Sequence, residues 1–174
     1  TTSGEFLING SLGVIAPDDI FVAQQSAHGS ATVNSRKVGN MVLFISGDGR
    51  KLLGTRYFED QNQWRAQELN FTADSLTEGK RIIDIAYTRN PDPIIWCLLD
   101  DGSLIGCSYD PFNGVIGWHR HTIGFIQGIC VTEKAGNSIL SVTAQRVING
   151  ATATYLEEFG GDYLDSSVVI ETTS

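Results

Sequence analysis

The chain has 174 residues, of which 41% are hydrophobic and 18% charged, the composition of an ordinary globular domain with its own core. Its net charge of −8 argues against specific nucleic-acid binding, because affinity there comes from lysine and arginine neutralising phosphate. No apolar run approaches the roughly 18 residues that a membrane span needs, so none is expected.

Glycine is frequent and proline rare, with 19 and 4 residues, which favours tight turns and an all-β fold over helical packing. One short helix is expected over Thr72–Glu78, with Thr72 as its N-cap and Gly79 just after its end. Residues Gly160–Ser167 are predicted to form a polar loop. In chain order, the apolar and β-branched runs predict strands at Glu5–Ile8, Ile20–Gln25, Ser30–Val33, Met41–Ser46, Lys51–Phe58, Trp64–Leu69, Ile82–Thr88, Ile94–Leu99, Ser103–Tyr109, Val115–His121, Ile126–Thr132, Ser138–Val147, Ala151–Phe159 and Val168–Thr172.

The chain is organised around residues Arg81–His121, which contain four of these predicted strands in about 40 residues. Asp101-Gly102 and Asn113-Gly114 supply the positive φ that hairpin turns require, and Asn90-Pro91-Asp92-Pro93 ends the first strand because proline has no N–H. Four antiparallel strands joined in this way match one blade of a β-propeller. A hairpin is also expected between Ile20–Gln25 and Ser30–Val33.

Similar turns recur along the chain, at Asp48-Gly49, Asp101-Gly102 and Asn149-Gly150. This repeat predicts several blades, and it predicts positive φ at Gly102 and Gly150. We therefore expect an all-β, propeller-like fold of antiparallel four-stranded blades, with a β-sandwich as the alternative. Residues 1–174 are expected to form a single propeller-like domain that is a piece of a longer chain.

An ordered series of motifs runs along the chain: VGNMVLF, GDGRKLLGTRYF, TEGKRIIDIAY, PDPIIWCLLDDGSLIGCSYD, GWHRHTIG and INGATATYLEEF. This series resembles the tail nozzle proteins (tail tubular protein B-like, or tail stabilisation, proteins) of short-tailed bacteriophages. The resemblance covers roughly Gly4 to Phe159 and is most specific at Gly117–Gly124 and Ile148–Glu158.

This resemblance implies a structural protein of the virion tail, made in the cytoplasm of the bacterial host. Nozzle proteins form a homo-oligomeric ring below the portal and its adaptor, next to tail fibres or spikes, and line the channel through which the genome leaves. They contain β-propeller-like domains and are usually far longer than this chain, which is therefore expected to be one domain of such a protein.

Val115–His121 is predicted to be the outer edge strand of its blade. Alternation along the strand places Trp118 and Arg120 on one face and His119 and His121 on the other. We expect the Trp118 face to pack on a neighbouring blade and the Arg120 guanidinium to reach a carboxylate. The two histidines are expected to face polar surroundings or a partner subunit.

The sequence contains no recognisable arrangement of catalytic or metal-binding side chains. Two imidazoles fall short of the four ligands of a closed zinc site, so neither a metal nor a cofactor is expected. Glu157 and Glu158 are neighbours on one strand and must face opposite ways, whereas Asp100 and Asp101 are explained as turn formers. With no G-x-S-x-G elbow and no P-loop, we expect no catalytic residues and no enzyme activity.

The cysteines and tryptophans leave two alternatives open. Cys97, Cys107 and Cys130 are interpreted as small buried apolar residues, although Cys97 and Cys107 lie on adjacent strands where a disulfide is possible. The tryptophans are expected to fill the space between blades. Alternatively, an exposed Trp64 or Trp118 beside polar residues would favour a carbohydrate-binding domain for host attachment.

Overall fold

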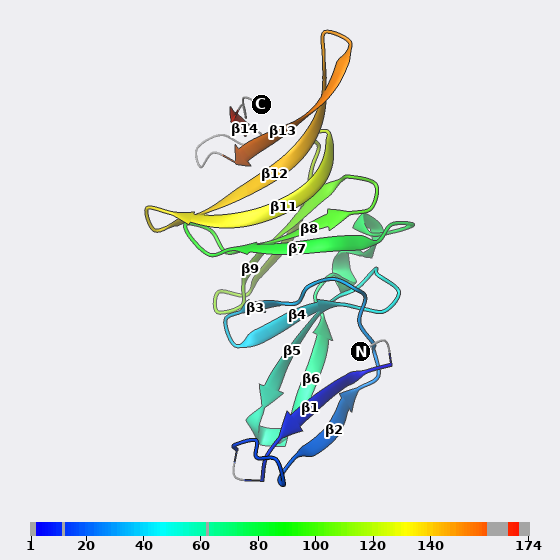
Figure 1. Ribbon diagram of the computed structural model, residues 1–174, viewed down its shortest axis with the longest axis vertical. Coiled ribbons are helices and arrows are strands. Elements are labelled where there is room, and N and C mark those ends of the chain that lie inside the picture. The colour runs from blue at the N-terminus through cyan, green and yellow to red at the C-terminus, as the bar shows by residue number, and fades with distance from the viewer. Residues whose placement is uncertain (1–2, 12, 62, 160–166, 171–174) are drawn as a thin grey trace. The chain divides into compact units, whose positions relative to one another are not determined.

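The computed structural model describes residues 3–11, 13–61, 63–159 and 167–170 (Figure 1). It contains 61% strand and 6% helix, so the predicted all-β class is confirmed. The chain divides into two compact units, Thr1–Thr72 and Ala73–Ser174, and each is described by itself. The single domain expected from the sequence stays a prediction. Within the described part of the chain, helices are too short and too polar to cross a membrane.

The first unit contains a two-stranded and a four-stranded antiparallel sheet. The short 3-10 helix η1 (Glu59–Gln61) lies in the turn before the last strand of the larger sheet. The small sheet consists of β1 (Glu5–Asn9) and β2 (Phe21–Ser26). The larger sheet consists, in spatial order, of β3 (Arg36–Val38), β4 (Met41–Ile45), β5 (Leu52–Phe58) and β6 (Gln63–Glu68).

The predicted hairpin around His28-Gly29 is wrong. Strand β2 instead pairs in antiparallel fashion with the preceding strand, β1, with Ile8 opposite Val22. Ser30 forms an isolated β-bridge with Ser46. The chain bends at Ser30–Val33 instead, where the Val33 N–H donates to the Ala31 carbonyl at 2.8 Å. Strand β3 was missed because its three residues include a single apolar side chain.

The predicted helix is shorter and of another type than expected. A 3-10 helix, η2, spans Phe71–Leu76 and is interrupted at Ala73, whose φ and ψ are −128° and 27°. Gly79 has a φ of 69°, which is the left-handed conformation expected of a residue that follows a helix.

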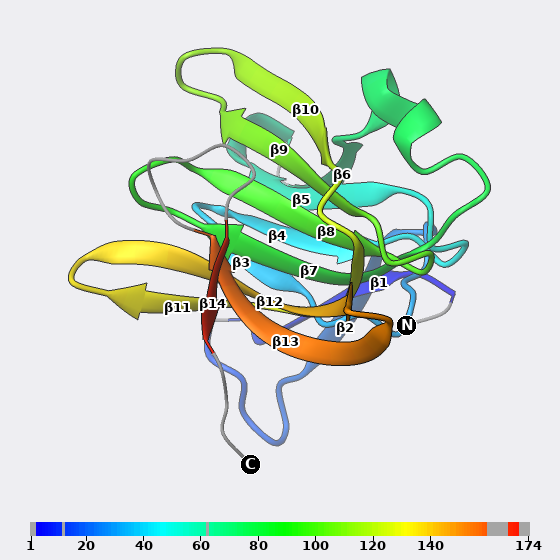
Figure 2. The same ribbon diagram turned by 90° about the horizontal axis from the view of Figure 1, so that it is seen from above.

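The second unit contains two four-stranded antiparallel sheets. Its first sheet confirms the four strands predicted in the central stretch, with one strand shifted by a single residue, and Figure 2 shows β10 at its edge. This sheet consists of β7 (Ile82–Thr88), β8 (Ile94–Leu99), β9 (Leu104–Asp110) and β10 (Val115–His121). The other sheet consists of β11 (Phe125–Lys134), β12 (Asn137–Ile148), β13 (Ala151–Phe159) and β14 (Ser167–Ile170).

The last predicted strand begins one residue late, since β14 starts at Ser167. Thr172 lies outside the described residues, and so does all of the predicted polar loop except its last residue, Ser167.

Each four-stranded sheet is a simple meander of four strands that follow one another in the chain. This order is typical of propeller blades, whereas Greek-key sandwiches interleave strands between their sheets. The three repeated turns occupy the same place in each meander, between its second and third strands. The repeat seen in the sequence is therefore a repeat of blade-like sheets.

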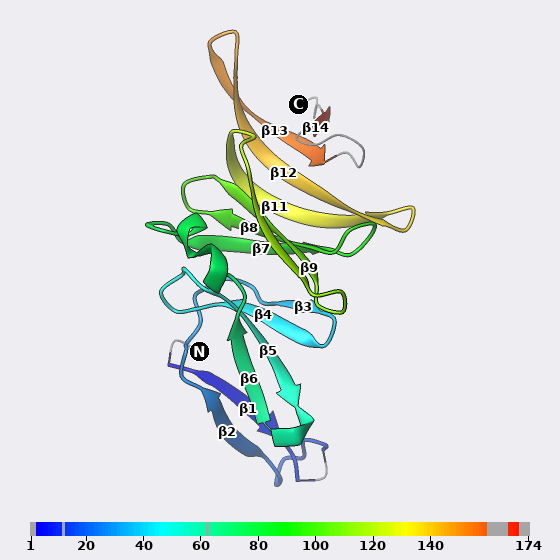
Figure 3. The same ribbon diagram turned by 180° about the vertical axis from the view of Figure 1, so that it is seen from behind.

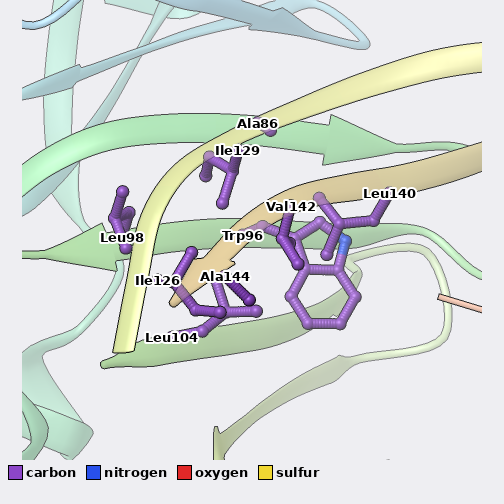
Figure 4. Close-up of a cluster of buried hydrophobic side chains, with 9 residues drawn as sticks. All are labelled: Ala86, Trp96, Leu98, Leu104, Ile126, Ile129, Leu140, Val142 and Ala144. Carbon is purple, nitrogen blue, oxygen red and sulfur yellow. The ribbon is translucent and has the colours of Figure 1, made fainter. Parts of the chain in front are cut away.

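The two sheets of the second unit pack face to face, and their first strands, β7 and β11, lie beside each other (Figure 3). Alternate residues of β12 point toward β8, so that Leu140 and Val142 approach Trp96 (Figure 4). Burying each large apolar side chain contributes about 1.5–3 kcal/mol. The cluster consists of Ala86, Trp96, Leu98, Leu104, Ile126, Ile129, Leu140, Val142 and Ala144.

Candidate functional site

The predicted site residues lie on one edge strand and in two turns. Strand β10 carries Trp118, His119, Arg120 and His121 and pairs only with β9 among the described strands, so its predicted edge position is confirmed. In the β8–β9 turn Gly102 has a φ of 77°, and in the β12–β13 turn Gly150 has a φ of 80°. The positive φ predicted for both glycines is therefore confirmed.

The two histidines of β10 contact each other and two aromatic residues. His119 Nδ1 and His121 Nε2 are 2.7 Å apart, so one ring nitrogen donates a hydrogen bond to the other. The centroid of the Trp96 ring lies 5.9 Å from that of His119 and 5.1 Å from that of His121. Phe159 of β13 lies 5.8 Å from His121 and 5.6 Å from Trp96. These four residues form the histidine–aromatic cluster, which joins the two sheets of the second unit.

Two neighbouring residues fix the histidine–aromatic cluster. Gly106 is directly opposite His119 in the β9–β10 register, and a Cβ atom at Gly106 would lie 2.2 Å from His119 Cε1. The ring of His119 therefore occupies space that only glycine leaves free. On the other side, the Trp96 indole N–H donates to the hydroxyl oxygen of Thr88 at 3.1 Å, which satisfies a buried polar group.

The role expected of the histidine face of β10 is wrong, whereas packing of the Trp118 face on a neighbouring blade stays a prediction. The histidine face packs toward the other sheet of the second unit, and it meets aromatic rings rather than polar surroundings. Trp118 is half-buried, and Arg120 is exposed and forms no ion pair within the described part of the chain. Alternation correctly separated the faces, but the close approach of Gly106 and Trp96 decided which one is covered.

The paired histidines do not belong to a larger ligand set. They share a face, as predicted, but their ring nitrogens bond to each other. Nowhere in the described ranges do three or more His, Cys, Asp or Glu side chains gather in a way that could hold a metal ion. The local chemistry is therefore that of hydrogen bonding and ring packing between the two sheets.

A buried ion pair that was not predicted from the sequence links β12 and β13, in the second sheet of the second unit. The Arg146 guanidinium donates from Nε to one Glu157 oxygen at 2.8 Å and from a terminal nitrogen to the other at 2.5 Å. It also donates to the Ile123 carbonyl. The Glu157 side chain is only 2% exposed, and its hydrogen bonds raise the pKa of Arg146. Gly124 makes room for the guanidinium, because a Cβ there would lie 2.4 Å from an Arg146 nitrogen.

The cysteines are free thiols, and two of the three are buried as expected. Burial raises the pKa of Cys97 and raises that of Cys107 to about 12, so both remain protonated. Cys130 is exposed, which corrects its predicted burial. A register shift between Ile126 and Gly128 turns Ile126 and Ile129 inward and leaves Cys130 on the outer face of β11.

The tryptophans do not form an exposed aromatic platform. Trp96 is buried, while Trp64 and Trp118 are both half-buried. Trp64 is opposite Tyr57 on β5, with ring centroids 5.8 Å apart, and its backbone N–H donates to the Gln25 side chain. The exposure that would favour carbohydrate binding is therefore not found at Trp64 or Trp118.

Most of the large exposed apolar side chains of the first unit lie on and around the two-stranded sheet, Tyr57 and Phe71 being the exceptions among the described residues. Phe6, Ile8 and Val22 are 45%, 55% and 56% exposed and lie on one face of the β1–β2 ribbon, as the register shows. A patch of this kind on a folded protein marks an interaction surface. Further exposed apolar residues of this segment are Val14, Ile15, Ile20 and Phe21.

Comparisons with models of known protein families and with curated proteins found no match for this chain.

Proposed function

We propose that this chain is a structural part of a bacteriophage tail, contained in the nozzle that assembles below the portal and adaptor. In this role it helps to form the wall of the conduit through which DNA is ejected. The resemblance of its motifs to nozzle proteins suggests this function, and the repeated blade-like meander is the observation that supports it best.

The distribution of polar and apolar groups agrees with a structural role. The buried ion pair and the histidine–aromatic cluster both bind residues within one unit to each other. The exposed face of β1–β2, in contrast, is the kind of surface that proteins cover when they assemble. The acidic chain is also suited to a conduit wall that does not bind the DNA passing along it.

Reconstitution of the assembly tests this proposal. The gene product that contains this chain would be produced with the portal and adaptor proteins encoded near it, and the mixture examined by electron microscopy and mass photometry. A ring bound below the adaptor is expected. A gene product that remains monomeric with both partners present would contradict the proposal.

A pair of matched variants tests whether the apolar face of the β1–β2 ribbon contributes specifically to assembly, or whether any exposed apolar residue would do so. Ile8→Ser with Val22→Ser is expected to weaken ring formation without unfolding the chain, because both side chains are exposed on one face of the ribbon. Val147→Ser is the control, since Val147 is 71% exposed in the second unit. Equal loss of assembly in both variants would show that the ribbon has no special role.

A further inference from the structure

The β5–β6 hairpin carries two arginines that are directly opposite each other. Arg56 and Arg65 are register partners and both are exposed. The Cβ atoms of two residues at such positions are about 4.5–5.5 Å apart, and like charges placed there destabilise a sheet. Two positive charges placed together in this way favour the binding of a group of opposite charge between them.

Each guanidinium is oriented by an uncharged neighbour on the same face. The Arg56 guanidinium carbon lies 4.6 Å from the centroid of the Phe58 ring, a cation–π contact. The Gln63 amide, with its oxygen toward Arg65, accepts from Arg65 Nε and from one terminal nitrogen, both at 2.8 Å. These contacts hold the planar groups in place but leave their charges uncompensated.

Among the described residues, no carboxylate forms an ion pair with Arg56 or Arg65, although acidic residues outnumber basic ones by 20 to 12 in the full sequence. Glu59 and Asp60 lie in the turn that joins the two strands, yet among the described residues neither forms an ion pair with Arg56 or Arg65. The carboxylates that do pair serve other cations, as in the Lys51–Glu68, Lys80–Asp101 and Arg146–Glu157 pairs.

We propose that Arg56 and Arg65 together bind a tetrahedral dianion, either inorganic phosphate or sulfate or the same group carried on a larger ligand. Two guanidiniums match a charge of −2, and each planar fork pairs with two oxygens of its ligand. A tetrahedral anion presents more than one such pair of oxygens, whereas one carboxylate presents a single pair. This site goes beyond the proposed tail function and does not depend on ring assembly.

Isothermal titration calorimetry on the isolated chain tests the site, with inorganic phosphate, sulfate and acetate compared at constant ionic strength. Phosphate and sulfate are expected to bind at least tenfold more tightly than acetate. O-phosphoserine and glucose 6-sulfate distinguish a free anion from one carried on a larger molecule, because a carried group adds contacts and binds more tightly than the free anion.

Five variants distinguish binding at this site from general attraction between the anion and positive charge. Arg56→Gln and Arg65→Gln should each weaken phosphate binding about tenfold, and Arg56→Lys should also weaken it, because lysine keeps the charge but lacks the planar fork. Arg120→Gln, which removes an exposed arginine on β10, should leave binding unchanged. Equal affinity for acetate and phosphate, or equal loss in Arg120→Gln, would overturn the proposal, as would undiminished binding in a folded double variant without Arg56 and Arg65.

Discussion

At the scale of single residues, two glycines show how close packing selects a residue type. Gly106 lacks a side chain because the His119 ring occupies that space, whereas Gly102 combines a φ of 77° with contact to a neighbouring strand. The Gly102 carbonyl accepts from the Ile126 N–H at 2.9 Å, and a Cβ at Gly102 would lie 2.4 Å from the Phe125 ring. The β8–β9 turn is therefore docked on the start of β11.

Gly102→Ala is expected to lower the free energy of unfolding by about 2–4 kcal/mol, from the left-handed backbone and the collision with Phe125. Gly150→Ala is the matched control, because Gly150 also has positive φ but has open space around it, and about 1 kcal/mol is expected. Urea denaturation measures both values. Equal losses would show that the contact with Phe125 does not contribute.

Part of the pH dependence of stability can be traced to one carboxyl group, that of Asp101 in the second unit. Burial opposes its ionisation, but hydrogen bonds from Lys80 and Ser103 outweigh burial and lower the Asp101 pKa to about 2. The unfolded value is about 3.9, so this stabilisation is fully present above pH 4 and is lost as the pH falls toward 2.

The stabilisation by Asp101 is expected to be below about 1 kcal/mol, because its side chain is 41% exposed and solvent screens the ion pair with Lys80. The difference in unfolding free energy between the original chain and Asp101→Asn should shrink between pH 5 and pH 3. Urea denaturation across that range checks it, and a difference that stays constant would contradict the assignment.

At the scale of secondary structure, charged and aromatic side chains specify how strands meet. Arg146 on β12 and Glu157 on β13 link adjacent strands and also hold the segment before β11 through the Ile123 carbonyl. Trp96 and Phe159 connect the two sheets through the histidines of β10. Strand β10 is thus covered on its histidine face by side chains of its own sheet and of the next one.

Arg146→Met is expected to destabilise the chain by about 3–5 kcal/mol, because it removes the guanidinium that pairs with the buried Glu157 carboxylate. Arg120→Met, at an exposed arginine on β10, is the control and should change stability by less than about 0.5 kcal/mol. The double variant Arg146→Met with Glu157→Leu should recover much of the loss. A double variant as unstable as Arg146→Met would show that the isolated charge was not the cause.

Trp96→Ala is expected to cost about 3–5 kcal/mol, because it removes a ring that is 5% exposed from the core between the sheets. Trp118→Ala should cost less, about 1–2 kcal/mol, because Trp118 is half-buried. Thermal and urea unfolding compare the two variants. A larger loss for Trp118 would show that its face, and not the core around Trp96, contributes more to stability.

At the scale of the whole molecule, the chain is two compact units, and the second contains both sheets of the described core cluster. Residues 73–174 expressed alone are therefore expected to fold and to unfold cooperatively. Near-ultraviolet circular dichroism, which reports the fixed environment of Trp96, and a single urea transition are the measurements. A flat near-ultraviolet spectrum would show that the second unit depends on residues 1–72.

The sequence by itself determined the features that local chemistry controls. The bounds of β7, β8, β10 and β13 were predicted without error, because alternating apolar runs and turn residues act over a few neighbours. The positive φ of Gly102 and Gly150 followed from the same turns.

Only the tertiary structure decided which faces are covered and which partners meet. A period of two residues separates the faces of β10 but does not say which one another sheet will cover, so the packing of the histidine face on aromatic rings was not predicted. The pairing of β2 with β1, the exposure of Cys130 and the burial of Glu157 likewise depend on elements distant in the sequence. Each is set by the neighbour that packs there, since burial is a property of the assembled sheets and not of one strand.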